Sequence, residues 1–225
     1  MKILFIGNSH TYMNDMPELA RLMIEDATGN SCEVFMLAYS GRSLKWHMEK
    51  EYFSERFNIL HGKYDYCVIQ EHAHPMEPEE DTIEYATKIA ELCKKAGTVP
   101  VIFETWAEKA KPENQAEMNR RYRNLAARLD AKLAPVGEIW NEVLKSSDAE
   151  LYFRDGEHAS PIGGYLTAMV ITKVITGRLP KKSFSTAFDF TVPDQFQPVK
   201  ESIQDVIIKL DSSIVSMIRQ LVSNE

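Results

Sequence analysis

Short apolar runs alternate along this chain with longer stretches of helical period, and this alternation limits the folds that it can adopt. The apolar runs predict strands at residues 2–6, 32–37, 66–70 and 99–104, with a shorter fifth at 133–136. The helical stretches cover residues 15–26, 43–60, 79–96, 113–131 and 161–177. Strands that alternate with helices form βαβ units, which build a parallel sheet covered on both faces. The sequence therefore predicts a doubly wound α/β/α sandwich of about five parallel strands.

Two of these helices carry residues that are typical of a helix start. Asp15 and Glu18 have the spacing of a capping box, with Pro17 between them. Ser160 precedes Pro161 in the same way, which predicts a cap followed by proline at the first helical position.

The last part of the chain differs in character from the first 180 residues. After a connector that contains Phe and Pro, residues 199–222 place one apolar stripe at helical spacing. We therefore expect one α/β domain at 1–180, with a connector and a long amphipathic helix at 181–225. That helix is expected to pack on its own domain or to form a homodimer contact. The stripe consists of Val199, Ile203, Val206, Ile207, Leu210, Ile214, Met217, Ile218 and Leu221.

The composition excludes several classes of protein. The chain has 225 residues, with 26 Lys and Arg against 33 Asp and Glu, a formal charge of −7. This balance provides no cationic field for phosphates and argues against a nucleic-acid partner. No run of eighteen apolar residues occurs, which argues against insertion into a membrane.

The cysteines and the N-terminus bear on the cellular compartment. Cys32, Cys67 and Cys93 are odd in number and widely spaced, which predicts buried free thiols rather than a disulfide framework. A reducing, cytoplasmic location follows. The apolar run at 2–6 ends at Gly7, too early for a signal peptide, although the sequence leaves open a signal removed ahead of it.

The residues after the first strand are candidates for nucleophilic chemistry. Gly7 permits a tight turn, and Ser9 then lies on the loop that leads into a helix. Backbone N–H groups at such a position favour a developing negative charge. Ser9 is therefore a candidate nucleophile, although a cap or turn residue is the simpler interpretation of this segment alone.

A second candidate segment lies near the end of the domain. Asp155 stands three residues before His158 in a turn that contains Gly156. One loop can thus supply an imidazole and the carboxylate that orients it, while the serine comes from elsewhere. A surface loop with a capping Asp is the alternative.

Together, Gly7-x-Ser9 and Asp155-x-x-His158 resemble the first and last sequence blocks of the SGNH (GDSL-like) hydrolase superfamily, over about residues 1–177. The resemblance implies a flavodoxin-like α/β/α sandwich. It also implies that Ser9 is the nucleophile, His158 the general base and acid, and Asp155 the residue that orients the imidazole. No cofactor or metal is implied.

The second and third blocks of the superfamily supply groups that bind the oxyanion. Gly41, after the second strand, resembles the glycine of the second block. The Asn of the third block is missing, and Gln70 carries the only amide at the end of the third strand. The resemblance therefore assigns the oxyanion hole to Ser9, Gly41 and Gln70, with His72 as a substitute for Gln70. The first block also departs from the common Gly-Asp-Ser, because Asn8 stands where Asp is usual.

Other residues at this edge are candidates for substrate contacts. We expect His10, Tyr12, Arg42, His72 and Trp106 to line the site, with Trp106 either a wall for the substrate or a packing aromatic.

His72 and His74 beside Glu71 also raise the alternative of a divalent metal site, which would suit a metal-dependent phosphoesterase. No further cluster in the sequence has ligand spacing, so a polar rim is the preferred interpretation.

The sequence thus predicts a serine esterase that acts on a small-molecule ester through an acyl-enzyme. The polar loops favour a short acyl group such as acetyl on a carbohydrate. A non-catalytic ligand-binding α/β protein is the main alternative.

Overall fold

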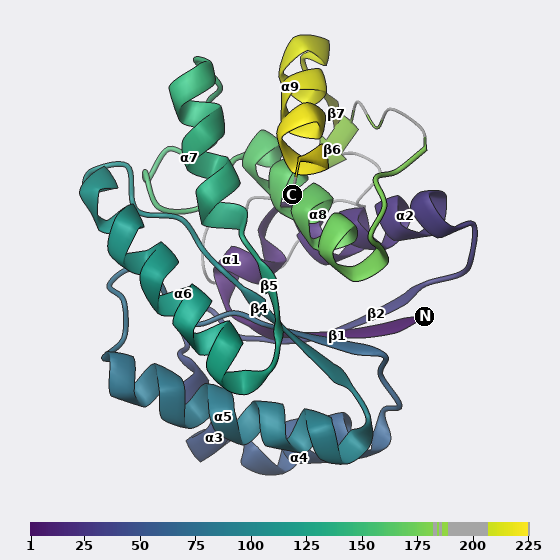
Figure 1. Ribbon diagram of the computed structural model, residues 1–225, viewed down its shortest axis with the longest axis vertical. Coiled ribbons are helices and arrows are strands. Elements are labelled where there is room, and N and C mark those ends of the chain that lie inside the picture. The colour runs from purple at the N-terminus through teal and green to yellow at the C-terminus, as the bar shows by residue number, and fades with distance from the viewer. Residues whose placement is uncertain (182–183, 185, 189–206, 225) are drawn as a thin grey trace.

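The computed structural model describes residues 1–181, 184, 186–188 and 207–224, and it is built on a five-stranded parallel sheet (Figure 1). The strand order is β2-β1-β3-β4-β5, with β1 paired to β2 on one side and to β3 on the other. This arrangement confirms the predicted fold class. The strands are β1 (Lys2–Gly7), β2 (Glu33–Ala38), β3 (Tyr66–Ile69), β4 (Val99–Phe103) and β5 (Lys132–Ala134).

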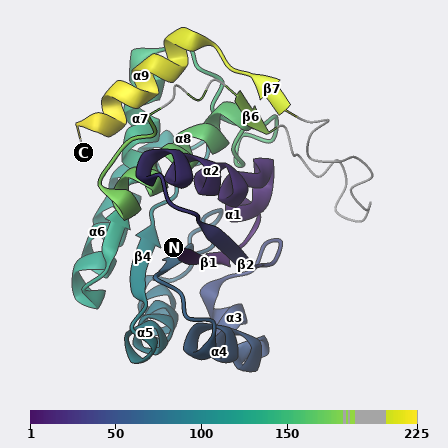
Figure 2. The same cartoon turned by 90° about the vertical axis from the view of Figure 1, so that its right-hand side faces the viewer.

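Helices cover both faces of the sheet, as Figures 1 and 2 show. Along β1, Ile3 and Phe5 point into one apolar core while Leu4 and Ile6 point into the other, because side chains alternate between the faces of a strand. The first core is covered by α2 (Met16–Thr28), α7 (Val136–Ser146), α8 (Pro161–Thr176) and α9 (Ser212–Ser223). The second is covered by α3 (Leu44–Lys50), α4 (Tyr52–His61), α5 (Glu79–Ala96) and α6 (Gln115–Leu129).

The structure corrects two element boundaries. The predicted helix over 43–60 is broken at Glu51 into α3 and α4. The predicted fifth strand ends at Ala134, and Val136 begins α7, which the sequence analysis missed. The apolar residues of this segment suit either a buried strand or a buried helix, so periodicity alone does not separate them.

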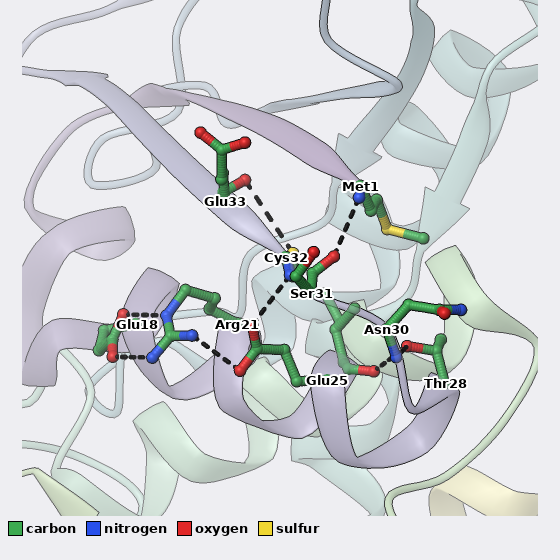
Figure 3. Close-up of polar contacts among 10 residues, drawn as sticks. Met1, Glu18, Arg21, Glu25, Thr28, Asn30, Ser31, Cys32 and Glu33 are labelled. Carbon is green, nitrogen blue, oxygen red and sulfur yellow. Dashed lines mark hydrogen bonds and ion pairs between the residues drawn. The ribbon is translucent and has the colours of Figure 1, made fainter.

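The predicted capping box at the start of α2 is wrong. Asp15 has a left-handed backbone with φ of 47° and caps no helical N–H, while Glu18 pairs with Arg21 at 2.6 Å. Arg21 also pairs with Glu25, whose carboxylate accepts the N–H of Cys32 at 2.9 Å (Figure 3). These contacts join α2 to the start of β2. The second predicted cap is confirmed, because the side chain of Ser160 accepts the N–H of Gly163 in α8.

The C-terminal part differs from the long helix predicted over 199–222. Residues 199–206 lie outside the described residues, and Ile207–Lys209 form β7, antiparallel to β6 (Thr186–Phe188). The helix begins only at Ser212, where Asp211 accepts the N–H groups of Ser213 and Ile214. α9 packs against α7 and α8 with one apolar face buried. A homodimer through this helix stays a prediction.

All three cysteines are buried free thiols, as expected. Of the helices within the described ranges, none combines the length and the apolar character that a membrane crossing requires.

Candidate active site

The loops that carry the predicted site residues leave the sheet at one edge, where the carboxyl ends of the parallel strands lie. Ligands bind at this edge in open α/β sheets. β1 ends at Gly7, and Ser9 begins the short helix α1 (Ser9–Tyr12) directly after it. The segment before α8, some 150 residues further along the chain, brings His158 to the side chain of Ser9.

Asn8 fixes the turn between β1 and α1. Its side-chain oxygen accepts the N–H of His10 at 3.1 Å, and its side-chain nitrogen donates to the carbonyl of Arg42 at 3.1 Å. Asn8 is completely buried. An aspartate could form the first of these bonds but not the second, because a carboxylate has no N–H to donate. An asparagine at position 8 therefore makes both contacts, where an aspartate would make one.

Ser9, His158 and Asp155 form a continuous chain of hydrogen bonds. Ser9 Oγ lies 2.7 Å from His158 Nε2, and His158 Nδ1 lies 2.7 Å from Asp155 Oδ2. Since a carboxylate only accepts, the proton of the neutral imidazole lies on Nδ1, and Nε2 is free to accept the serine hydroxyl. This is the arrangement that an activated serine requires.

The loop around Asp155 orients its carboxylate for this contact. Asp155 Oδ1 accepts the backbone N–H groups of Glu157 at 2.9 Å and of His158 at 3.0 Å. Gly156, which lies between Asp155 and Glu157, has a φ of 76°, in the left-handed region that favours glycine. Partial burial opposes ionisation, but the hydrogen bonds from Glu157 and His158 outweigh it and lower the pKa of Asp155. Asp155 is thus held as a carboxylate.

Trp106 binds the loop that carries Asp155 and His158. Its indole N–H donates to the carbonyl of Glu157 at 2.8 Å, and its ring stacks on Trp140 with centroids 4.0 Å apart. Trp106 has no exposed surface, so the predicted role as a wall for the substrate is wrong and the packing alternative holds. The N–H of Lys109 also donates to the carbonyl of Gly156 at 2.8 Å.

Gly41 lies in an exposed turn after β2. Its φ is 64°, and the turn is closed by the N–H of Arg42 on the carbonyl of Tyr39 at 3.1 Å. Asn8 binds the carbonyl of Arg42, which ties this turn to the turn that carries Ser9. Within the described part of the chain, the N–H groups of Gly41 and Ser9 form no hydrogen bond and are free to donate. Their role in an oxyanion hole stays a prediction.

Gln70 has a different role from the predicted one. Its side-chain oxygen accepts the N–H of Asn8 and the hydroxyl of Thr11, each at 2.9 Å, and its side-chain nitrogen donates to the carbonyl of Glu71. With no exposed surface, it cannot reach a substrate oxygen without rearrangement. We therefore correct the assignment: Gln70 is a clamp between the end of β3 and the turn that carries Ser9.

Two further histidines pack beside the triad. The ring of His10 lies 4.8 Å from that of His158 and 5.1 Å from that of His74. Burial, together with the neighbouring His158 and His74, holds the pKa of His10 well below its usual range. Burial also lowers the pKa of His74 to about 4. Both rings are therefore neutral near pH 7, and the buried His10 packs against His158 rather than lining an open surface.

The remaining candidates for substrate contacts are Tyr12, Arg42 and His72. Tyr12 is half-buried, and the exposed Arg42 lies over the ring of Trp46 at 5.1 Å. The backbone N–H of His72 donates to Glu71 at 2.7 Å, and its ring faces Glu77 at 3.4 Å. No group of three or more His, Cys, Asp or Glu residues in the described ranges has the arrangement of a metal site.

The sequence analysis missed one buried pair near this edge. His47 on α3 and Glu55 on α4 have no exposed surface, and His47 also contacts the carbonyl of Gly7 at 2.8 Å. Nothing in the sequence pointed to the pair, because its members lie on separate helices that were predicted as one.

Comparison with known proteins relates this fold to a class of hydrolases. No protein-family model and no curated protein matches the chain. A presumed SGNH hydrolase from Slackia heliotrinireducens superimposes with a TM-score of 0.65 at 27% identity, covering 78% of this chain and 98% of that one. Axe2, an acetylxylan esterase from Geobacillus stearothermophilus, gives 0.64 at 14% identity over 78% and 94%. A lipase/acylhydrolase from Enterococcus faecalis gives 0.60 at 18% identity over 80% and 98%. The fold is therefore SGNH-like.

Proposed function

We propose that the protein is a serine ester hydrolase with Ser9 as nucleophile. The observation that carries the proposal is the pair of 2.7 Å contacts that join Ser9 to His158 and His158 to Asp155. Ordinary packing does not explain why the side chain of Ser9 meets the Asp155–His158 pair of a loop some 150 residues away in this order. The SGNH-like fold supports the same function.

The reaction follows from the direction of these hydrogen bonds. Ser9 Oγ attacks the ester carbonyl carbon as its proton moves to His158 Nε2. The tetrahedral intermediate collapses, the ester C–O bond breaks, and His158 returns the proton to the leaving alcohol. Water then attacks the acyl-enzyme, with His158 taking its proton and passing it to Ser9 Oγ. Asp155 stabilises the imidazolium in both halves.

The negative oxygen of each tetrahedral intermediate needs hydrogen-bond donors. The free N–H groups of Ser9 and Gly41 are the candidates, and removal of one such donor typically costs about 3 kcal/mol of transition-state stabilisation. Gln70 is no longer included, because its side chain is completely buried and its amide holds Asn8, Thr11 and Glu71.

The substrate we propose is a short acyl ester, with acetyl on a carbohydrate as the first choice. The loops around Ser9 are polar, and Axe2, which shares the fold, is described as an acetylxylan esterase. A ligand-binding protein without turnover is the second candidate, because the third sequence block has lost its usual Asn.

Labelling of the serine tests the proposal. The protein is incubated with a fluorophosphonate, and its intact mass and tryptic peptides are measured. A single adduct on Ser9 that is absent from Ser9→Ala supports the hydrolase. A folded protein that acquires no adduct would reject it in favour of the binding protein.

A further inference from the structure

Asn14 lies in the short connection between α1, which begins with Ser9, and helix α2. Its backbone is left-handed, with φ of 57° and ψ of 22°, and Asp15 after it is left-handed as well. This region is uncommon for a residue with a Cβ, and asparagine is one of the few that enter it. Two such residues in succession mark the connection as strained, and backbone strain clusters at functional sites.

The side chain of Asn14 ties this connection to the loop that carries His158. Its amide nitrogen donates to the carbonyl of Ala159 at 2.9 Å and to the carbonyl of Ser160 at 3.1 Å. These two carbonyls come directly after His158, and Asn14 itself follows Ser9 by only five residues. One amide thus bridges the two segments whose side chains meet in the contact between Ser9 Oγ and His158 Nε2.

The surroundings leave Asn14 little freedom. It is 1% exposed, and α2 and α8 lie side by side next to it (Figure 1). A Cβ at Gly164 on α8 would lie 3.1 Å from the Cβ of Asn14, so a larger residue at position 164 would press on it. The amide oxygen of Asn14 is buried and forms no hydrogen bond to the described residues. Because both the backbone and this oxygen are unfavourable, the favourable contribution of Asn14 is its hold on the two carbonyls.

The loop is held on both sides of His158. Before His158, the indole of Trp106 donates to the carbonyl of Glu157. After His158, Asn14 binds the loop from the Ser9 segment. Asp155 belongs to the loop itself and accepts the backbone N–H of His158 as well as contacting its ring. Release of the Asn14 side should therefore change the distance from His158 to Ser9 and leave the Asp155–His158 pair intact.

We propose that Asn14 is a positioning residue that sets the distance between Ser9 Oγ and His158 Nε2 through the two carbonyls after His158. The inference rests on the proposed function, because this distance matters to catalysis only when a proton passes between the two atoms. Asn14 contacts neither reacting atom, and it acts through the backbone of the loop.

Asn14→Gly tests the proposal. Glycine adopts the left-handed backbone without strain, so the variant keeps the turn and loses only the amide. We expect kcat for 4-nitrophenyl acetate to fall about 10–100-fold with KM nearly unchanged, because a displaced base affects the transition state more than binding. A kcat equal to that of the wild type would overturn the proposal.

Asn14→Asp separates the donated hydrogen bonds from the shape of the side chain. Aspartate has nearly the same shape and also tolerates a left-handed backbone, but its carboxylate has no N–H to donate to a carbonyl. We expect kcat to fall at least as far as in Asn14→Gly. Wild-type activity of Asn14→Asp would mean that the amide donor is not needed, and the proposal would fail.

Two control variants distinguish positioning from loss of stability. Asp15→Gly relaxes the neighbouring left-handed residue, whose side chain caps no helical N–H, and should leave kcat unchanged. Thr98→Val removes the buried 2.9 Å hydrogen bond to the carbonyl of Tyr64 at the opposite edge of the sheet. It should lower the melting temperature without lowering kcat. If Thr98→Val and Asn14→Gly lose kcat equally at the same melting temperature, destabilisation explains the effect and the proposal is wrong.

An NMR measurement separates this inference from the proposed function. Because Ser9 Oγ lies 2.7 Å from His158 Nε2, the ring protons beside that nitrogen, Hε1 and Hδ2, should give an NOE to the Hβ protons of Ser9. We expect Asn14→Gly to lose this NOE and to keep the resonance of the His158 Nδ1 proton, which Asp155 holds. That result in a protein that hydrolyses no ester would retain the positioning role and reject the proposed function. An NOE that persists in Asn14→Gly, or loss of both signals, would reject the positioning role even in an active hydrolase.

Discussion

His47 donates from Nε2 to the carbonyl oxygen of Gly7, 2.8 Å away and two residues before Ser9 in the chain. The other ring nitrogen lies 2.5 Å from Glu55 Oε1, and both side chains are completely buried. On the opposite side of the same peptide group, the N–H of Asn8 donates to Gln70. The peptide group between Gly7 and Asn8 is therefore hydrogen-bonded at both its carbonyl and its N–H. These two bonds position the backbone just before Ser9 and α1.

Removal of this contact should reduce turnover more than binding. Because loss of one partner leaves a buried charge uncompensated, the comparison is made in a Glu55→Gln background. There, His47→Ala should lower kcat for 4-nitrophenyl acetate about tenfold with little change in KM, since a small displacement of the nucleophile affects the transition state.

A conservative variant distinguishes positioning from general destabilisation. His47→Gln in the same background keeps an N–H donor near the position of Nε2 and should recover most of kcat. If both variants lose kcat and melting temperature to the same extent, the contact is only structural.

The sequence predicted the fold because each strand carries its own local signal. Ile3 and Phe5 alternate with Leu4 and Ile6 in a short apolar run, and β1 has few other ways to bury both faces. Asp155 and His158 were predicted together because they stand three positions apart in one loop.

The roles of Gln70 and Trp106 were not predictable in the same way. The sequence places both at the end of a strand but does not say toward which partner a side chain turns. Gln70 turns back to Asn8, 62 residues earlier, and Trp106 turns to Glu157, 51 residues later. Such long-range partners are decided by packing, which leaves no periodic pattern in the sequence.

Gln70→Ala should reduce stability before it affects chemistry. The substitution leaves the buried N–H of Asn8 and the hydroxyl of Thr11 without their acceptor, and each orphaned group costs about 1–3 kcal/mol. We expect a fall of that order in the free energy of unfolding, measured with urea. A loss of about 10²-fold in kcat at unchanged stability would instead restore the role of oxyanion donor.

The triad variants should differ in degree. Ser9→Ala and His158→Ala are expected to lose kcat on the order of 10⁶-fold, as when a nucleophile or base of such a triad is removed. Asp155→Asn should lose less, about 10⁴-fold, because the ring of His158 keeps its place but the amide no longer holds the imidazole proton on Nδ1, where Nε2 is free to accept from Ser9. Hydrolysis of 4-nitrophenyl acetate provides the rates, and unchanged melting temperatures exclude unfolding. Activity like the wild type in either alanine variant would end the triad assignment.

Glu71 should make stability depend on pH. Burial raises its pKa to about 7 from an ordinary value of 4.5, although its carboxylate accepts the N–H groups of Leu44 and His72. Between these two values the folded protein holds a proton that the unfolded chain has released. Stability therefore falls as pH rises through this window, and the cost is complete above pH 7.

Glu71→Gln removes the ionisable group and keeps an oxygen acceptor for both N–H groups. It should raise the free energy of unfolding on the order of 3 kcal/mol at pH 8 and leave it nearly unchanged at pH 4, where the carboxyl is protonated in both states. Urea unfolding at the two pH values measures the difference, with the exposed Glu91→Gln as control. An equal gain at both pH values would mean that the amide improves packing rather than removing a buried charge.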